Sequence, residues 1–153
     1  MATFGTFVDN VSLKASELND CFKVTSFLPV LRQSVVVDQT NNSKGSYFQV
    51  NKIVICSIRC PIQSSGTLNS RIELDLPVTA ASSSVRVIGG GRIRDVTLND
   101  FLLLRAVQIS TTRVAFLSDT TNSLSTYLGQ TDGPNMQLEN GDNLIINLMY
   151  EAA

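Results

Sequence analysis

The chain contains no histidine and no tryptophan, and only 16% of its 153 residues are charged. Without histidine, neither Ser-His-Asp nor Cys-His catalysis nor a histidine-containing zinc site is possible. A charged fraction below the usual value of about 25% predicts a surface covered by Ser, Thr, Asn and Gln, or in part by another chain. The composition therefore excludes these classes of site and is compatible with a surface partly covered by another chain.

The chain also lacks a strong net charge and a long apolar run. Its net charge is −1, which gives no reason to expect a nucleic-acid partner. No apolar run approaches the ~18 residues of a membrane span, so we expect no membrane contact. The first residues lack a basic start followed by a long apolar run, so we expect no secretory signal.

Cysteine is scarce, with Cys21, Cys56 and Cys60 as the only examples. On one strand, Cys56 and Cys60 would share a face at a distance of about 13 Å, too far for a disulfide. This spacing predicts reduced, buried thiols and assembly in a reducing cytoplasm. A zinc site built from the three would need a fourth ligand and closer spacing, so we expect no metal and no cofactor.

Two strand-like runs on either side of a polar turn dominate the pattern. The run from Tyr47 to Cys60 is rich in β-branched residues and ends at Pro61, which lacks a backbone donor. The run from Arg71 to Leu76, RIELDL, alternates strictly between charged and apolar residues. We expect the two runs to pair as a hairpin at the centre of the fold.

Most of the remaining segments also predict β-strands. Further strand-like runs, bounded by turn residues, are 32–37, 85–94, 101–109, 113–117 and 144–150. Near the start, Leu18 and Phe22 recur at helical spacing and Ser12 can cap, which predicts one short helix ending before Leu28. We therefore predict an antiparallel β-sandwich of jelly-roll type with a short N-terminal helix. Residues 1–28 would be an anchoring arm and 29–153 the sandwich domain.

Three groups of residues have patterns that also occur at functional sites. Glu73 and Asp75 share one face of a strand at a spacing used by glycosidases, but alternation alone explains them. Gly89-Gly90-Gly91 followed by arginines could hold a phosphate, but no helix follows, so a bulge or the close approach of another backbone is favoured. Scattered loop aspartates, Asp119, Asp132 and Asp142, lack the density of a calcium site.

Two parts of the chain resemble a known class of proteins. The opening, FVDNVSLKASELNDCF, resembles the start of many tail-fibre and related structural proteins of tailed bacteriophages, with Leu13, Ala15, Leu18 and Asn19 in the matching places. Lys14 stands where those proteins usually have a small hydroxyl residue. The body is similar to small phage β-sandwich modules, in which a Gly-x-Tyr strand opens the core and a Gly-Asp precedes a last strand ending in Tyr, here Tyr150.

The resemblance implies a trimeric, non-enzymatic module of the virion, assembled in the host cytoplasm. We expect a capsid decoration or cement protein that contacts other copies of the same chain and the major capsid protein. The alternative is a tail fibre, adaptor or receptor-binding module that contacts other tail proteins or a host glycan. Apolar residues near the start and the triple glycine are the expected interface. These candidates are Phe4, Phe7, Val8, Leu18, Phe22, Gly89, Gly90 and Gly91.

Overall fold

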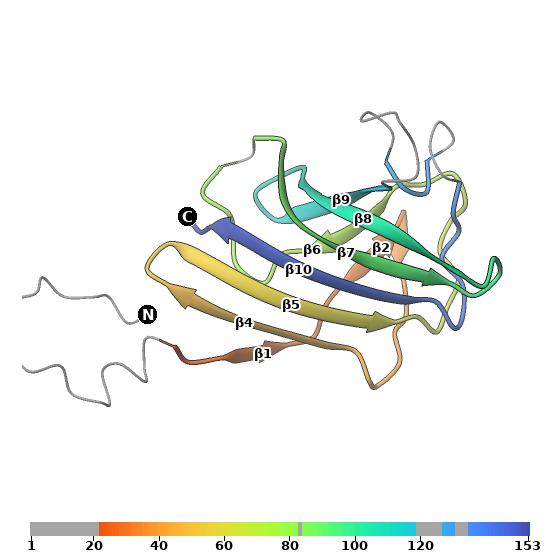
Figure 1. Cartoon of the computed structure of the whole chain (residues 1–153), viewed down its shortest axis with the longest axis horizontal. Helices are drawn as coiled ribbons and strands as arrows, with labels where there is room; N and C mark the ends of the chain where they lie inside the picture. Colours follow the sequence, from red (N-terminus) through yellow and green to blue (C-terminus); the bar gives the residue numbers. More distant parts are fainter. Residues whose placement is uncertain (1–21, 83, 119–126, 131–134) are drawn as a thin grey trace, which may run out of the picture.

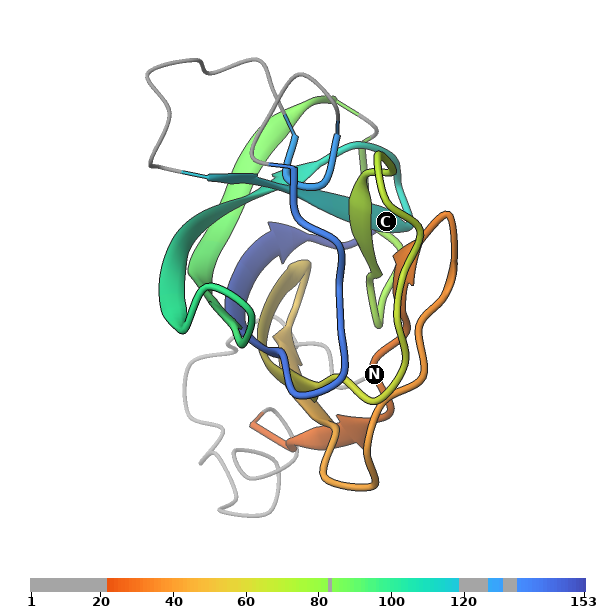
Figure 2. The ribbon, with the colours of Figure 1, turned by 90° about the vertical axis from the view of Figure 1, so that its right-hand side faces the viewer.

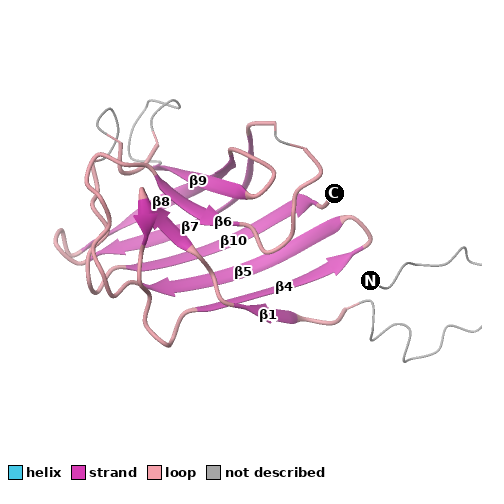
Figure 3. Cartoon of the chain, turned by 180° about the vertical axis from the view of Figure 1, so that it is seen from behind, coloured by secondary structure: helices cyan, strands magenta, loops and turns pink. Residues whose placement is uncertain are grey.

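A computed structural model describes residues 22–82, 84–118, 127–130 and 135–153, and these form one antiparallel sheet of ten strands (Figure 1). The strands are β1 (Thr25–Phe27), β2 (Leu31–Gln33), β3 (Val35–Val36), β4 (Lys44–Val50), β5 (Ile53–Pro61), β6 (Ile72–Asp75), β7 (Arg86–Asp95), β8 (Asp100–Gln108), β9 (Arg113–Ser118) and β10 (Asn143–Glu151). The described residues form strands, turns and loops without a helix (Figure 3). The predicted all-β, antiparallel class is confirmed.

The strands lie in the order β1-β4-β5-β10-β7-β8-β9-β6-β2-β3. The central pairs are nested along the chain, because β5 pairs with β10, β6 with β9 and β7 with β8. Further ladders join β10 to β7 and β9 to β8. The sheet curls strongly and wraps its inner face around the core, as the view along its edge shows (Figure 2).

Alternation places one apolar face of every long strand inside this curl. In β5 and β10, every second residue is buried and the residues between them are exposed or half-buried. The buried residues of these two strands are Val54, Cys56, Ile58, Cys60, Leu144, Ile146, Leu148 and Tyr150. The period of two in the sequence therefore decides which side of the sheet each residue occupies.

Two predicted strands are each divided by a turn. The run 47–60 is split between β4 and β5 by Asn51 and Lys52, and the run 32–37 is split between β2 and β3 by Ser34. Asn51 has φ 54° and Ser34 has φ 66°, a left-handed conformation that reverses the chain. Asn adopts this conformation more readily than most residues, but the surrounding β-branched residues obscured the turn.

The predicted hairpin between the run ending at Cys60 and the run 71–76 is wrong. β5 pairs with β4 and β10, whereas β6 pairs with β2 and β9 on the other side of the sheet. The connection between β5 and β6 therefore crosses the molecule rather than turning back on itself. Within β6 the alternation itself is confirmed, because Ile72 and Leu74 are fully buried and Glu73 and Asp75 face outward.

The predicted N-terminal helix falls almost entirely on residues 1–21, which lie outside the described part of the chain. Within the predicted arm, residues 25–27 form β1, which pairs with β4 along the edge of the sheet. No helix of the described residues is long and apolar enough to cross a membrane.

A buried amide joins the strands to the loops at one end of the sheet. The side chain of Gln33 is fully buried and donates hydrogen bonds to the Ser70 and Met136 carbonyls at 3.0 and 2.7 Å. Its oxygen accepts a bond from the Leu138 amide at 2.9 Å. Because each polar atom of the amide is satisfied, burial of Gln33 positions these loops instead of destabilising the fold.

Candidate interaction surface

The outer face of the curled sheet presents exposed polar and apolar side chains that a partner could contact. It has two parts with different chemistry. We call the outer face of β2, β6 and β9 the paired half, and the outer face of β4, β5, β10 and β7 the basic half. Both are built from side chains that alternate with core residues along the same strands.

On the paired half, each acid is bound by two arginines. Asp75 accepts two bonds from Arg32, at 2.8 and 3.1 Å, and lies 3.4 Å from Arg113. Glu73 contacts Arg71 at 2.6 Å and Arg113 at 3.1 Å, and its side chain is 14% exposed. The hydrogen bond and charge of Asp75 raise the pKa of the Arg32 guanidinium. This network neutralises most of its own charge.

The Glu73 and Asp75 pair therefore has a structural explanation. Cross-strand arginines on β2 and β9 form ion pairs with both carboxylates, so a charge network within the sheet accounts for the pair. A shallow polar pocket of about 410 Å³ lies beside them, lined in part by Asn69, Arg71 and Gln130. Arg71 also stacks over the Tyr127 ring at 5.1 Å, which further orders this side of the sheet.

On the basic half, cations lie next to one another without acids between them. Lys44 is directly opposite Arg59 across β4 and β5, and Arg59 is opposite Ile145 on β10. Arg92 follows on β7, opposite Ile145, with Arg94 two residues further along the same strand. All four cations are exposed. Among the described residues, no ion pair involves any of them.

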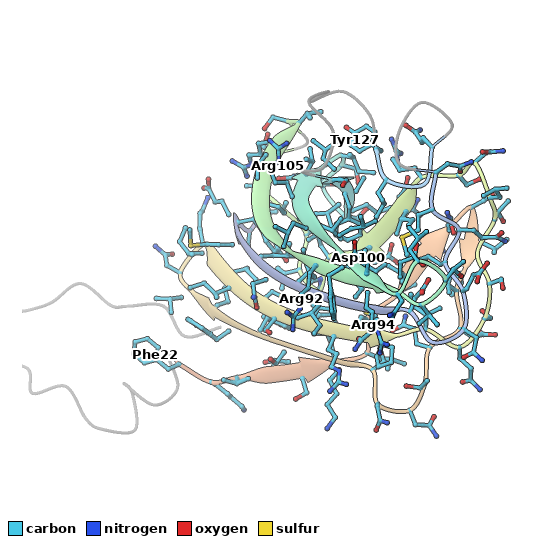
Figure 4. The ribbon with its side chains drawn as sticks, turned by 45° about the vertical axis from the view of Figure 1, so that its right-hand side comes forward. Phe22, Arg92, Arg94, Asp100, Arg105 and Tyr127 are labelled. Carbon is cyan, nitrogen blue, oxygen red and sulfur yellow. The ribbon has the colours of Figure 1, made fainter. Side chains whose placement is uncertain are left out.

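Like charges directly opposite each other on a sheet are destabilising. Arg92 is partly accommodated by the Phe101 ring, which lies 5.0 Å from its guanidinium carbon. Asp100, at the start of β8, accepts a bond from the Phe101 amide at 2.7 Å. Figure 4 shows Arg92 and Arg94 along β7, with Asp100 nearby and Phe22 at the far end of the sheet.

An exposed apolar row lies on the same face, closer to the turn at Asn51. It consists of Phe48, Ile55 and Met149, which are opposite one another across β4, β5 and β10. Met149 is 61% exposed and Ile55 39% exposed. Phe22, one of the predicted interface residues, is 55% exposed, and its ring lies 6.5 Å from that of Phe48. Phe22, which was predicted to be an interface residue, thus lies beside this apolar row.

A groove of about 910 Å³ continues the basic half toward the edge strand β1. Its lining includes Leu28, Lys44, Arg59 and Ile145, together with serines of β1, β4 and β5. The groove therefore combines cations, hydroxyl groups and aliphatic surface. This mixture suits a polypeptide with acidic and apolar side chains better than a purely polar ligand.

The triple glycine occupies the part of β7 that lies against β10. A Cβ atom at Gly89 or Gly91 would lie 2.0 Å from the carbonyl oxygen of Asn147 or Ile145, respectively. The ladder between β7 and β8 shifts register between Val87 and Gly89. The expected bulge and close backbone approach are both present, and the approaching backbone is β10 of the same chain. Involvement of these glycines in a contact with another chain stays a prediction.

The remaining predictions concern four interface residues near the start of the chain and the two cysteines of β5. Phe4, Phe7, Val8 and Leu18 lie outside the described residues. Cys56 and Cys60 are free and buried as predicted, and burial raises the pKa of both thiols to about 12.

The Asp142 carboxylate accepts bonds from the Val96 and Glu139 amides at 2.9 Å each, which ties two turns together. Burial raises the pKa of Asp142. No group of three metal-ligating side chains occurs in the described ranges.

Sequence reasoning did not identify Lys44, Arg59, Arg92 and Arg94 as a group. The alternation of Arg92 and Arg94 with Gly91 and Ile93 is a visible signal that they share a face. Their proximity to Lys44 and Arg59 depends on the position of β10 between β5 and β7.

In comparisons with known proteins, no family model, no curated protein and no solved structure matches the chain.

Proposed function

We propose that this chain is a non-catalytic structural protein of a tailed-phage virion, and that it is a homo-oligomeric, trimeric decoration protein on the capsid. The virion assignment rests on the resemblance of its sequence to phage structural modules. The observation that carries the structural role is the basic half, where exposed cations and the apolar row lie together on one face of the sheet. A decoration protein would use such a face against neighbouring copies or the major capsid protein.

Within the antiparallel all-β class, we propose that the strands are arranged as a jelly roll. A jelly roll arises when a long antiparallel ribbon rolls up, so that early and late strands pair from the outside inward. The nested pairs of β5 with β10, β6 with β9 and β7 with β8 support this arrangement. The proposal includes the short helix within the N-terminal segment as an anchoring element.

The state of the reactive side chains favours a non-catalytic role. Each carboxylate of the strongest candidate pair is bound by arginines. The thiols of Cys56 and Cys60 lie in the core with a raised pKa, which makes them poor nucleophiles.

A tail fibre, adaptor or receptor-binding module is the second candidate. The fibre-like opening supports it, as does the polar pocket beside Asn69 and Gln130, which offers amide and guanidinium donors to a host glycan. Against it, this sequence contains no repeat or coiled-coil region that would form a shaft.

Copy number in purified virions tests the proposal. Quantitative mass spectrometry would compare this chain with the major capsid protein. Hundreds of copies per particle are expected for a decoration protein. A dozen or fewer would overturn that role in favour of the tail. Absence from the particle would overturn both roles.

A further inference from the structure

We propose that residues 1–21 of one copy bind the basic half and the apolar row of a neighbouring copy. The inference rests on the homo-oligomeric role proposed above and names the contact by which the oligomer forms.

The face requires an occupant that is both acidic and apolar. Lys44 and Arg59 face each other across two strands, and no described residue forms an ion pair with either. The apolar row, with Ile55 and Met149 exposed, adjoins them on β5 and β10. A nucleic acid or sulfated glycan would satisfy the cations but leave these aliphatic side chains uncovered, so a polypeptide fits the whole face better.

The first 21 residues have this composition. They contain the acids Asp9, Glu17 and Asp20 against the single base Lys14, which gives a net charge of −2. Their large apolar residues include Phe4, Phe7, Val8 and Leu18. A segment of this length can extend over about 70 Å, whereas four neighbouring strands span only about 15 Å from the first to the last axis. One segment can therefore reach both the cations and the apolar row.

The direction of the chain at Phe22 favours a neighbouring copy. β1 runs antiparallel to β4 at the edge of the sheet, with Thr25 opposite Tyr47 and Phe27 opposite Gly45. The chain upstream of β1 therefore leaves the sheet near Phe48, where Phe22 already packs. Lys44 and Arg59 lie at the other end of β4 and β5. To cover its own cations the segment would have to turn back over the sheet, whereas binding to another copy needs no such reversal.

Sedimentation velocity of the full-length chain across a concentration series, at low and high salt, tests the proposal. We expect a concentration-dependent mass that is a multiple of 16.6 kDa and that falls as salt screens the cations. Arg59→Glu should weaken association at least about tenfold, the effect of roughly 1.4 kcal/mol at a charged contact. Because the new Glu would face Lys44, the variant should keep its thermal stability.

Two further variants make the test specific. Lys52→Glu changes the net charge by the same amount but lies in the β4–β5 turn, exposed, beside the apolar row and away from the cations, so it should weaken association much less than Arg59→Glu. Glu17→Lys should weaken association alone and restore it when combined with Arg59→Glu.

Three results would overturn the proposal: a full-length chain that stays monomeric at every concentration, association that survives Arg59→Glu, or a double variant without rescue. If the chain stays monomeric but Arg59→Glu releases it from virions, the face binds another virion protein instead. Conversely, rescued association in a chain absent from virions would uphold this contact and refute the virion role.

Discussion

The two halves of the outer face carry similar numbers of arginine and lysine side chains, but only one of them supplies the opposing charges. On the paired half, Glu73 and Asp75 lie between arginines of β2 and β9 and the arginine before β6, at 2.6 to 3.4 Å. On the basic half, the positions between the cations are held by Ile145 and Asn143. One sheet can thus pair the charges on one part of its outer face and leave the cations on a neighbouring part without acidic partners among the described residues.

The comparison separates charges that stabilise the fold from charges that serve recognition. Removing a member of the paired half leaves a half-buried charge without its partner, which is destabilising. Removing Lys44 or Arg59 from the basic half removes a repulsion, because these two like charges face each other across β4 and β5. The change in the free energy of unfolding in matched variants therefore shows which half stabilises the fold.

Gly91→Val should break the strand pairing on which the basic half depends. The new Cβ would lie 2.0 Å from the carbonyl oxygen of Ile145, on the strand between the cations. We expect a loss of more than about 3 kcal/mol, or failure to fold, because the β7–β10 ladder must separate. Urea unfolding measures the change. Gly90→Ala is the control, since its Cβ meets only the Leu104 carbonyl at 3.2 Å. Equal losses in the two variants would refute the argument.

Alkaline pH should destabilise the core beneath the basic half. Cys56 and Cys60 have a pKa of about 12 in the folded chain, because burial disfavours the thiolate, against about 8.5 when unfolded. The thiols therefore support the fold fully below pH 8.5, and this support is lost as the pH rises toward 12. By pH 10 the loss should be on the order of 2 kcal/mol per thiol.

Urea unfolding at pH 7, 8.5 and 10 measures this loss. Cys60→Ala should begin less stable at pH 7, because it leaves a small cavity, but should lose less stability between pH 8.5 and 10. An unchanged slope would show that the thiols are not its source.

Glu73→Gln should make the paired half resemble the basic half. Arg71 and Arg113 would lose a common carboxylate whose side chain is only 14% exposed. We expect a loss of about 1–2 kcal/mol in stability, since charge-assisted hydrogen bonds are replaced by weaker ones. Thermal unfolding at low and high salt measures it. Arg94→Gln on the basic half serves as the control and should have little effect. A neutral result for Glu73→Gln would remove the distinction between the halves.

Arg59→Glu should make the basic half resemble the paired half. The new carboxylate would face Lys44 across β4 and β5, which replaces a repulsion by an attraction. We expect a gain in stability of up to about 0.5 kcal/mol, within the range of exposed pairs, and the gain should shrink at high salt. Arg59→Gln separates the two contributions by removing the repulsion alone. A clear loss of stability would mean that Arg59 supports the fold.

Much of the fold could be predicted from short-range pattern. The alternation in RIELDL, the apolar positions of the last strand and the turn between β8 and β9 all match the structure. The errors came where a turn uses a residue other than glycine or proline. Ser34 and Asn51 reverse the chain with positive φ inside β-branched surroundings, so two hairpins looked like single strands.

Pairing of distant strands could not be predicted in the same way. The run 71–76 seemed to pair with the strand before it, but the structure places it between β2 and β9. Nor does the sequence around Gln33 indicate that this glutamine is buried, because its partners Ser70, Met136 and Leu138 lie 37 to 105 residues away. Long-range contacts of this kind depend on the packing of the whole chain.

The all-β class, the inward and outward sides of the strands, and the burial of Cys56 and Cys60 follow from local sequence pattern. These properties follow from the side-chain period of two and from the transfer of apolar groups out of water, both of which act over a few residues. The position of β10 between β5 and β7 is set by the packing of the whole chain, and it is this strand order that brings Lys44, Arg59, Arg92 and Arg94 onto one surface. Strand order sets which charges become neighbours, because residues on adjacent strands meet at about 5 Å whatever their separation along the chain.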